Sequence, residues 1–502
     1  MLKKYAAGIA VTGIVVSLFA GCGAKEGKDV SEINKGNQVM GVSVHDPNVV
    51  KDGDIYYIFG THMEAAKSTD LQGFKSFASG VKASNPLFDN LFTDEMEAFS
   101  FVGEYQDGGY AVWAPTVVYN EAMGKYVMYF SSSRDYRTST ISMATADSIE
   151  GPYHYEAQLL HSGYTRLDVE KTNFYEVLGA DADVKTYLSG GQYNNLNYPN
   201  CIDPAVFYDE DGKMWMVYGS WSGGIWLHEL DEKTGLVIHP QASEEEHIDT
   251  YYGRYLMGGL HNSCEGPFIL YDETTGYYYL FVSYGGLTRE GGYQIRQYRA
   301  ENVTGPYVDA AGQTFDYVVG HDSIGLKMMG NYSLPSLKTA YMAPGHCSAM
   351  IDGDGTYYLV YHTRFDSGSE YHEPRVHQMF VNEEGWLVVA PFSTTGAVRC
   401  DAYTQLSELA GEYHLLNHGT DIGAEIHSTQ KMTVNKKGNL SLADGTKGSL
   451  VLDAEDGYVT LTIGDVVYKG VVFDMTDEAG NPVRCISAAA SNNETIWAVL
   501  YR

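Results

Sequence analysis

Cysteine is scarce in this chain of 502 residues, which has six, and none of them form a CxxC pair. A zinc ribbon needs such pairs, so the spacing argues against one. Beyond residue 22, five cysteines remain, and an odd number at wide spacing argues against a disulfide framework. Hydrophobic residues make up 44% of the chain, which is enough for an ordinary buried core and excludes wholesale disorder.

Positive charge is also in short supply, with 33 Lys and Arg against 64 Asp and Glu, a formal net charge of −31. Nucleic acid needs a basic face for its phosphates, so this class of partner is excluded. A neutral ligand such as a sugar is compatible with the charge. The six tryptophans contrast with 41 tyrosines and 55 glycines, a balance that favours strands joined by tight turns.

The chain opens with two lysines at positions 3 and 4, followed by an apolar run from Tyr5 to Phe19. A membrane span needs ~20 apolar residues, so the run is short for a stable anchor and predicts a secretory signal over residues 1–21. Its end, LFAGC, resembles the bacterial lipobox, which implies cleavage before Cys22, lipidation of Cys22 and export to a cell surface or periplasm-facing membrane. The alternatives are an ordinary signal peptide and an uncleaved helix. Residues 22–39 are polar without period and are predicted to form a tether.

A strand–turn–strand pattern occurs five times, at intervals of roughly 60 to 90 residues. Each copy starts at a distinctive polar or aromatic residue and ends in a Tyr-rich strand, over residues 45–59, 113–130, 201–221, 264–282 and 345–361. Hairpins repeated at this scale indicate blades around an axis. We therefore predict an all-β fold, with a five-bladed β-propeller over residues 40–398 whose first strands line a central channel.

The pattern changes after residue 400, where short alternating strands replace the aromatic hairpins. Residues 399–502 are therefore predicted to form a separate small β-barrel or sandwich. No cluster of catalytic residue types lies in this part of the sequence. A long insert rich in Tyr and Asn, residues 158–198, is expected to form a loop over one face of the propeller.

Three carboxylates, Asp46, Asp203 and Glu265, stand at the starts of three repeats and are expected to converge at one end of the channel. A single Asp-Pro pair is usually no more than a turn, but three carboxylates at corresponding positions, two of them directly before proline and Glu265 two residues before Pro267, indicate chemistry. Glycoside hydrolysis uses such a set, with one carboxyl group protonated as the acid and another ionised. A third can raise the pKa of the acid by like-charge repulsion.

These blade starts resemble those of the family 43 glycoside hydrolases, and particularly of the endo-arabinanases. The stretches that carry the resemblance are VHDP at 44–47, WAP at 113–115, NCIDPA at 200–205, YGSW at 218–221, HNSCEGPF at 261–268, APGHCS at 343–348 and RVHQMF at 375–380. The match runs in order from about residue 40 to 395. The tail resembles, more weakly, the extra β domain of longer extracellular arabinanases.

The resemblance implies hydrolysis of α-1,5-linked L-arabinan with inversion of configuration. Asp46 matches the general base, Asp203 the residue that tunes the acid, and Glu265 the general acid. His346 matches a channel histidine near a metal ion, usually calcium, and its alternative is a hydrogen-bonded core histidine. Trp113 and Trp221 match aromatic walls of the sugar cleft, and the alternative for each is that it only packs blades together. Asn200 and Ser220 match residues that make polar contacts in the same cleft.

Other functions remain open at this point. An exo-acting arabinofuranosidase or β-xylosidase could use the same scaffold, and a blocked end of the cleft would favour it. A sugar-binding lipoprotein without turnover would be expected to have lost a carboxylate, whereas all three are present. A retaining fructan hydrolase would need a nucleophile, and the stretch around His346 argues against it. The protein is expected to act as a monomer.

Overall fold

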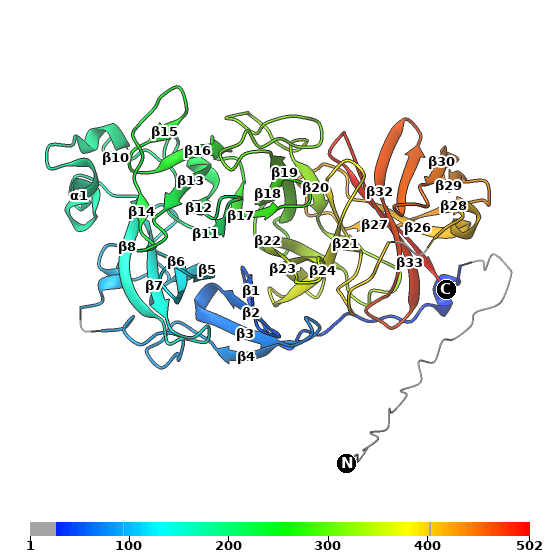
Figure 1. Ribbon diagram of the computed structural model, residues 1–502, viewed down its shortest axis with the longest axis horizontal. Helices are drawn as coiled ribbons and strands as arrows, with labels where there is room; N and C mark the ends of the chain where they lie inside the picture. Colours follow the sequence, from blue (N-terminus) through cyan, green and yellow to red (C-terminus); the bar gives the residue numbers. More distant parts are fainter. Residues whose placement is uncertain (1–26, 94, 401–402) are drawn as a thin grey trace, which may run out of the picture.

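The computed structural model describes residues 27–93, 95–400 and 403–502, and Figure 1 shows its course. The predicted signal segment and Cys22 lie outside the described residues. Within these ranges, no helix has the length and apolar character needed to cross a bilayer. Almost all regular structure is β-strand, as predicted, arranged as a propeller followed by a barrel.

Four-stranded antiparallel sheets form the first two blades. Blade 1 comprises β1 (Asn48–Asp52), β2 (Ile55–Gly60), β3 (Glu64–Ser68) and β4 (Lys75–Ala78). Blade 2 comprises β5 (Val112–Asn120), β6 (Lys125–Ser133), β7 (Ser139–Ala146) and β8 (His154–Ser162). Each first hairpin coincides with one of the predicted repeats.

Blade 4 is likewise four-stranded, whereas blades 3 and 5 carry additional short strands. Blade 3 comprises β11 (Ala205–Tyr208), β12 (Met214–Gly219), β13 (Ile225–Leu230) and β16 (Gly253–Met257), with β14 (Val237–Ile238) and β15 (Ile248–Asp249) beside them. Blade 4 comprises β17 (Glu265–Asp272), β18 (Tyr277–Tyr284), β19 (Gln294–Ala300) and β20 (Leu326–Met329). Blade 5 comprises β22 (Tyr341–Ile351), β23 (Tyr357–Phe365), β24 (His372–Val381) and β25 (Leu387–Val389), with β21 (Tyr332–Ser333) beside β22.

The first strands close into a ring around the axis. Strand β1 contacts β5 and β22, β5 contacts β11, β11 contacts β17, and β17 contacts β22. This confirms the five-bladed propeller and places the start of every repeat at the channel. The blades have buried apolar faces on both sides, which is why strands such as β7 are buried throughout rather than in alternation.

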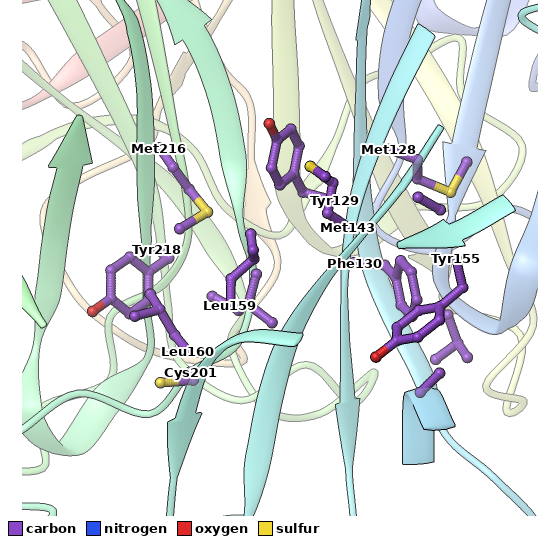
Figure 2. Packing of buried hydrophobic residues seen from close by; sticks show 14 of the residues in the cluster. Met128, Tyr129, Phe130, Met143, Tyr155, Leu159, Leu160, Cys201, Met216 and Tyr218 are labelled. Carbon is purple, nitrogen blue, oxygen red and sulfur yellow. The ribbon is translucent and has the colours of Figure 1, made fainter. Parts of the chain in front are cut away.

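Large side chains fill the space between neighbouring blades. Figure 2 shows residues of β6, β7 and β8 packed near Met216 and Tyr218 of β12. Several buried tyrosines donate their hydroxyl groups to backbone carbonyls, as Tyr129 does to Gly235 at 2.8 Å and Tyr218 to Tyr252 at 2.8 Å. At these positions tyrosine supplies packing area inside the propeller while its hydroxyl stays hydrogen-bonded.

The insert after β8 differs from the predicted loop over the propeller face. It folds into a compact flank with α1 (Phe174–Leu178), β9 (Leu188–Ser189) and β10 (Gln192–Tyr193), at the left edge of Figure 1. Phe174 and Tyr187 are buried there and contact Tyr251 and Tyr252, which precede β16. Hydrophobic packing against blade 3 thus draws the insert outward.

The C-terminal part is a closed eight-stranded barrel, which settles the choice between barrel and sandwich. Its strands are β26 (Gly411–Asn417), β28 (Gln430–Val434), β29 (Asn439–Leu442), β30 (Lys447–Leu452), β31 (Tyr458–Ile463), β32 (Val466–Thr476), β33 (Pro482–Ala490) and β34 (Thr495–Tyr501). The barrel shares a hydrophobic core with blades 4 and 5, in which the Trp497 indole donates to the carbonyl of Val389 at 2.7 Å.

One short strand of the C-terminal part pairs with the propeller instead of the barrel. Strand β27 (His427–Ser428) pairs in parallel with β21 and so extends the sheet of blade 5. The segment before the propeller also lies against the barrel, since Ile33 is buried and the Asn34 amide donates to the Asn481 side chain at 3.1 Å. A free tether would therefore comprise only the residues that precede this segment.

Short 3-10 turns connect several strands. They are η1 (Val30–Glu32), η2 (Thr61–Met63), η3 (Glu97–Phe99), η4 (Val169–Lys171), η5 (Val184–Tyr187), η6 (Trp221–Gly223) and η7 (Leu406–Leu409). Turns η2 and η6 each follow the second strand of a blade and present side chains to the channel end described next.

Candidate active site

A cavity of about 1150 Å³ lies at one end of the propeller channel. All the predicted site residues within the described ranges line it: Asp46, Trp113, Asn200, Asp203, Ser220, Trp221, Glu265 and His346. No residue between 158 and 199 lines this cavity, so the insert does not cover it. A narrow extension along the axis, about 20 Å³, is bounded by Asp46, Asp203, His346 and the first residues of the inner strands.

The five blade starts share a backbone conformation as well as a place on the axis. Each has one residue with positive φ: Asp46 (53°), Ala114 (39°), Asp203 (56°), Gly266 (57°) and His346 (44°). The first four are followed by proline. Ala114 and Gly266 are therefore the structural equivalents of Asp46 and Asp203. Trp113 and Glu265, which were expected to be the equivalents, lie one residue before them. Bulges in β5 and β17 begin at these two residues and redirect the chain.

Asp46 is 8% exposed and has an unusually full set of partners. The Thr61 hydroxyl donates to Oδ2 at 2.5 Å, while Nδ1 of His45 and Nδ1 of His346 lie 2.7 and 3.1 Å from Oδ1. Burial opposes ionisation, but the charges of His346 and His45 outweigh it and hold the pKa of Asp46 well below its usual range. This carboxylate is therefore ionised at neutral pH.

His362 of β23 holds the backbone of Asp46 and contacts His45, one of the partners of its carboxylate. Its Nδ1 accepts the backbone N–H of Asp46 at 3.2 Å, and its ring stacks on His45 with centroids 3.7 Å apart. Burial holds the pKa of His362 well below its usual range, so the ring is neutral and an acceptor. The backbone at Asp46 is thus anchored by a side chain from blade 5.

The other two carboxyl groups occupy a different environment. Glu265 Oε2 accepts from the Trp221 indole at 2.6 Å and from the Ser220 hydroxyl at 3.2 Å. Asp203 Oδ2 accepts the backbone N–H of Gly266 at 3.2 Å. Burial raises the pKa of Asp203, and the charges of Glu265 and Asp46 add to the rise. Burial also raises the pKa of Glu265, with a smaller contribution from Asp46.

His346 lies between these groups. Its ring contacts Gly266, where an added Cβ would stand 2.9 Å from the ring carbon Cγ. Burial opposes its charge, yet the carboxylates of Asp46, Asp203 and Glu265 together raise its pKa to about 9. Without a metal, the imidazolium is the cation that balances the carboxylates on the axis.

The two tryptophans predicted to form the walls of the cleft have different surroundings. Trp113 lies near His62, with ring centroids 5.0 Å apart, and near Tyr105, at 5.6 Å. Trp221 is 36% exposed, so its ring is available to a sugar face while its N–H holds Glu265. Both residues therefore line the cavity rather than serving only to pack blades together.

Asn200 and Ser220 line the cavity, but their polar atoms already have partners. The Asn200 amide accepts from the Ser162 hydroxyl at 3.1 Å and donates to the carbonyl of Tyr136 at 3.2 Å. Ser220 donates to Glu265. In this structure they hold neighbouring groups, and their contact with substrate stays a prediction.

Sequence reasoning missed His45, Thr61, His362 and Tyr293, all of which line the cavity or contact Asp46. His45 directly precedes Asp46, which was a usable signal. His362 is hidden inside the Tyr-rich strand of blade 5, and Tyr293 follows a glycine-rich turn, so neither shows a pattern of its own.

The oxygen donors around His346 can be tested against calcium, which takes about 6–8 oxygen ligands. In the narrow extension, the Ser348 hydroxyl already donates to the carbonyl of Pro47 and Asn48 Oδ1 accepts the Val117 amide. The carboxylates of Asp46 and Asp203 and one nitrogen of His346 remain. This donor set fits a divalent cation whose other ligands are water. His45, Asp46 and His362 form a second group with ligand atoms within 4.8 Å of one another.

Known protein families match both the propeller and the barrel. The protein-family model described as "Glycosyl hydrolases family 43" matches residues 36–387 of the sequence. The chain belongs to this family. A second model, described as a C-terminal lipocalin-like domain, matches residues 391–498, the region of the barrel.

Individual relatives of this family 43 glycoside hydrolase match along most of its length. An extracellular endo-α-(1→5)-L-arabinanase of Thermotoga petrophila is 36% identical over 91% of this chain and 93% of its own length. An extracellular endo-α-(1→5)-L-arabinanase 2 of Bacillus subtilis is 35% identical over 91% and 92%. The crystal structure of the Thermotoga petrophila endo-1,5-α-L-arabinanase aligns with a TM-score of 0.77 and 34% identity, over 93% of this chain and 99% of that one.

A crystal structure of a family 43 protein, YxiA of Bacillus licheniformis, aligns with a TM-score of 0.80 and 35% identity, over 93% of this chain and 99% of that one. The whole arrangement of propeller and barrel is therefore shared with family members, since both alignments extend through the barrel.

Proposed function

We propose that this family 43 glycoside hydrolase is an endo-acting α-1,5-L-arabinanase that inverts the anomeric configuration. The observation that carries the proposal is the separation of protonation states inside one cavity: Asp46 is held ionised, whereas burial favours the protonated form of Glu265. Hydrolysis with inversion needs one group of each kind. The names of two relatives that each match over 91% of this chain supply the substrate class.

Each carboxyl group has a definite part in the proposed reaction. Asp46 accepts a proton from water as the water attacks the anomeric carbon, and its two histidine partners keep it ionised beforehand. Glu265 gives its proton to the leaving oxygen, oriented by Trp221 and Ser220. Asp203 lies beside Glu265 and disfavours early loss of that proton.

Product analysis on debranched arabinan, xylan and levan tests substrate and mode together. We expect a ladder of arabino-oligosaccharides from arabinan alone, with the inverted anomer appearing first by NMR. Release of single arabinose units, or activity on xylan, would replace the proposal with an exo-acting arabinofuranosidase or a β-xylosidase. No residue of the insert lines the cavity, and this favours the endo mode.

Two isosteric variants test the catalytic roles. Asp46→Asn and Glu265→Gln should each reduce kcat by about 10²–10⁴-fold, the usual contribution of a general base or acid. Both should bind arabino-oligosaccharide and show the circular dichroism of the parent. Parental turnover in either variant would remove that residue from the mechanism, and binding without any turnover in the parent would identify a sugar-binding lipoprotein.

We further propose a calcium ion at His346, on the channel axis. His346 and waters held by Asp46 and Asp203 would bind it, and a dication there would supply positive charge that stabilises the ionised carboxylates. His346→Ala should weaken calcium binding in metal analysis of dialysed protein. Dialysed protein without calcium, together with activity that chelators leave unchanged, would reduce His346 to a hydrogen-bonding partner of Asp46.

Export with lipidation at Cys22 is the remaining part of the proposal. The two relatives from Thermotoga petrophila and Bacillus subtilis are named as extracellular enzymes. A lipid chain contributes ~0.8 kcal/mol per buried CH₂ group and is attached through the thiol. Cys22→Ala should therefore move the protein out of the membrane fraction, and unchanged fractionation and gel mobility would exclude the anchor. Gel filtration of the released form should give a monomer.

A further inference from the structure

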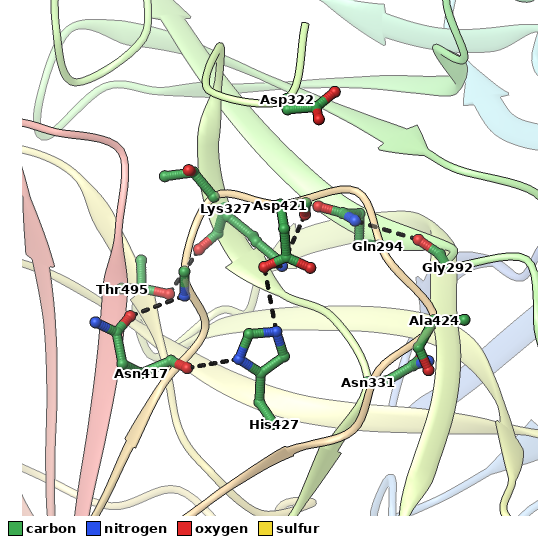
Figure 3. A network of polar contacts seen from close by, with 12 residues as sticks. Gly292, Gln294, Asp322, Lys327, Asn331, Asn417, Asp421, Ala424, His427 and Thr495 are labelled. Atoms are coloured by element: carbon green, nitrogen blue, oxygen red, sulfur yellow. Dashed lines mark hydrogen bonds and ion pairs between the residues drawn. The ribbon is translucent and has the colours of Figure 1, made fainter.

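A loop of the C-terminal barrel, residues 418–427, lies on blade 4 of the propeller rather than on the barrel. It leaves after β26 and ends in β27, which pairs with β21 of the propeller. Figure 3 shows Asp421 and His427 of this loop facing Lys327 and Gln294 of blade 4. We refer to residues 418–427 as the barrel loop.

Two buried cations of blade 4 hold the barrel loop. Arg296 Nη2 donates to the carbonyl of Thr420 at 2.6 Å and to that of Asp421 at 3.2 Å. Lys327, 1% exposed, donates to the carbonyl of Asp421 at 2.9 Å and to its carboxylate at 3.1 Å. Charged donors of this kind are costly to bury without acceptors, so the loop completes the polar core of the blade.

Further bonds fix the shape of the loop itself. His427 Nε2 lies 3.2 Å from the Asp421 carboxylate, and its Nδ1 contacts the carbonyl of Asn417 at 2.9 Å (Figure 3). Asn331 of the propeller donates to the carbonyl of Ala424 at 2.8 Å. The loop is therefore held at both ends and in the middle.

The barrel loop touches the segment that forms one wall of the cavity. At Gly292, with φ of +72°, an added Cβ would stand 2.8 Å from the carbonyl carbon of Gly423. The next residue is Tyr293, and Leu287 of the same segment also lines the cavity. Gln294 accepts from the Arg296 guanidinium at 2.7 Å and donates to the carbonyl of Gly292 at 3.2 Å. One guanidinium thus holds both the loop and the segment.

Tyr293 connects this wall to the chemistry. It is buried and lines the cavity together with Glu265, and its hydroxyl acts to lower the pKa of that carboxyl group. Its ring fills the space above Gly345, where an added Cβ would stand 2.1 Å from the ring, and it stacks on His362 with centroids 5.9 Å apart. The ring has little freedom once its backbone is fixed.

We propose that the barrel loop is a positioning element of the active site, which fixes the backbone before Tyr293 and makes Tyr293 a positioning residue for Glu265. This inference rests on the proposed role of Glu265 as general acid. It gives the C-terminal barrel a part in catalysis although no barrel residue lines the cavity within the described ranges.

The test compares three variants of the full chain. Asp421→Ala combined with His427→Ala removes side-chain contacts of the barrel loop. Tyr293→Phe removes only the hydroxyl. The control, Lys469→Ala with Glu383→Ala, deletes an ion pair of 2.7 Å that also joins barrel and propeller but contacts no residue of the cavity wall. Hydrogen exchange of residues 285–294 and the pH profile of arabinan hydrolysis are measured for each.

We expect faster exchange in residues 285–294 in the loop variant and no change in the control. The loop variant and Tyr293→Phe should each lose about tenfold in kcat with KM nearly constant, because an interaction with the reacting acid is lost. Because the hydroxyl stabilises the ionised form of Glu265, both should move the basic limb of the profile to higher pH. Combining them should add nothing further.

Faster exchange with an unchanged basic limb, unchanged exchange, or additive effects would each overturn the proposal. Exchange is read without substrate, so failure of the loop to brace the wall is distinguishable from failure of the parent to hydrolyse arabinan, which would instead refute the proposed function.

Discussion

Replacing Gly266 by alanine tests whether His346 sets the protonation of Asp46. The new Cβ would stand 2.9 Å from Cγ and 3.0 Å from Nδ1 of His346. Ordinary carbon contacts are about 3.5–4.0 Å, so the ring must retreat by about 0.5–1 Å. The contact between His346 and Asp46, already 3.1 Å, would then leave hydrogen-bonding range. A displacement of this size in a catalytic group costs on the order of 10²-fold in rate.

The charge of His346 helps to hold the pKa of Asp46 low, so its retreat should raise that pKa. The base must be ionised to act, and the acidic limb of the kcat/KM profile should therefore move to higher pH in Gly266→Ala. The pH dependence of initial rates on debranched arabinan measures both effects.

A matched control separates the clash from backbone strain. Gly53, in the turn after β1, has the same φ of +57° and no atom within 4 Å of an added Cβ. Both substitutions force alanine into a left-handed conformation, at about 1–2 kcal/mol. Gly53→Ala should thus lose stability and keep the parental profile. An unshifted acidic limb in Gly266→Ala, or equal loss of activity in both variants, would refute the reasoning.

Three further outcomes follow from the site. Trp221→Phe removes the donor that favours ionised Glu265, so the basic limb should move to higher pH; a fixed limb in the rate profile would contradict the hydrogen bond. Asp203→Asn removes a like charge, so the basic limb should move to lower pH, and an unchanged profile would exclude the tuning role. In metal-free protein, the pKa of His346 is raised to about 9, so its stabilisation is complete below about pH 6.5 and lost as the pH rises through 9. Thermal midpoints across this range should fall in the parent and not in His346→Ala.

The propeller could be predicted because each blade begins with a recognisable local sequence pattern. An Asp-Pro or similar start, a glycine-containing turn and a Tyr-rich strand lie within about twenty residues, and both strands of each first hairpin formed as expected. The convergence of Asp46, Asp203 and His346 followed from ring closure, which needs no information beyond the repeat.

The one-residue offset of Glu265 and Trp113 could not be predicted in this way. The spacing from these two residues to the following proline indicated an offset. However, the face of the strand from which a side chain projects depends on a β-bulge, and a bulge leaves no pattern in a single sequence. His362 and the barrel loop were missed because their importance arises from contacts across several hundred residues or between domains.

The left-handed residues at the five blade starts have a consequence for how such enzymes can diversify. The backbone at these positions is set by ring closure and a following proline or bulge, while the side chains differ: aspartate, alanine, aspartate, glycine and histidine. Four blades thus offer one position each on a common axis where the side chain can differ, whereas Gly266 is constrained because an added Cβ would meet the His346 ring. A substitution at one of these four positions alters the charge at the axis without redesigning a blade, so new specificities can be reached one blade at a time, and Ala114 is the one of the four that carries no functional group.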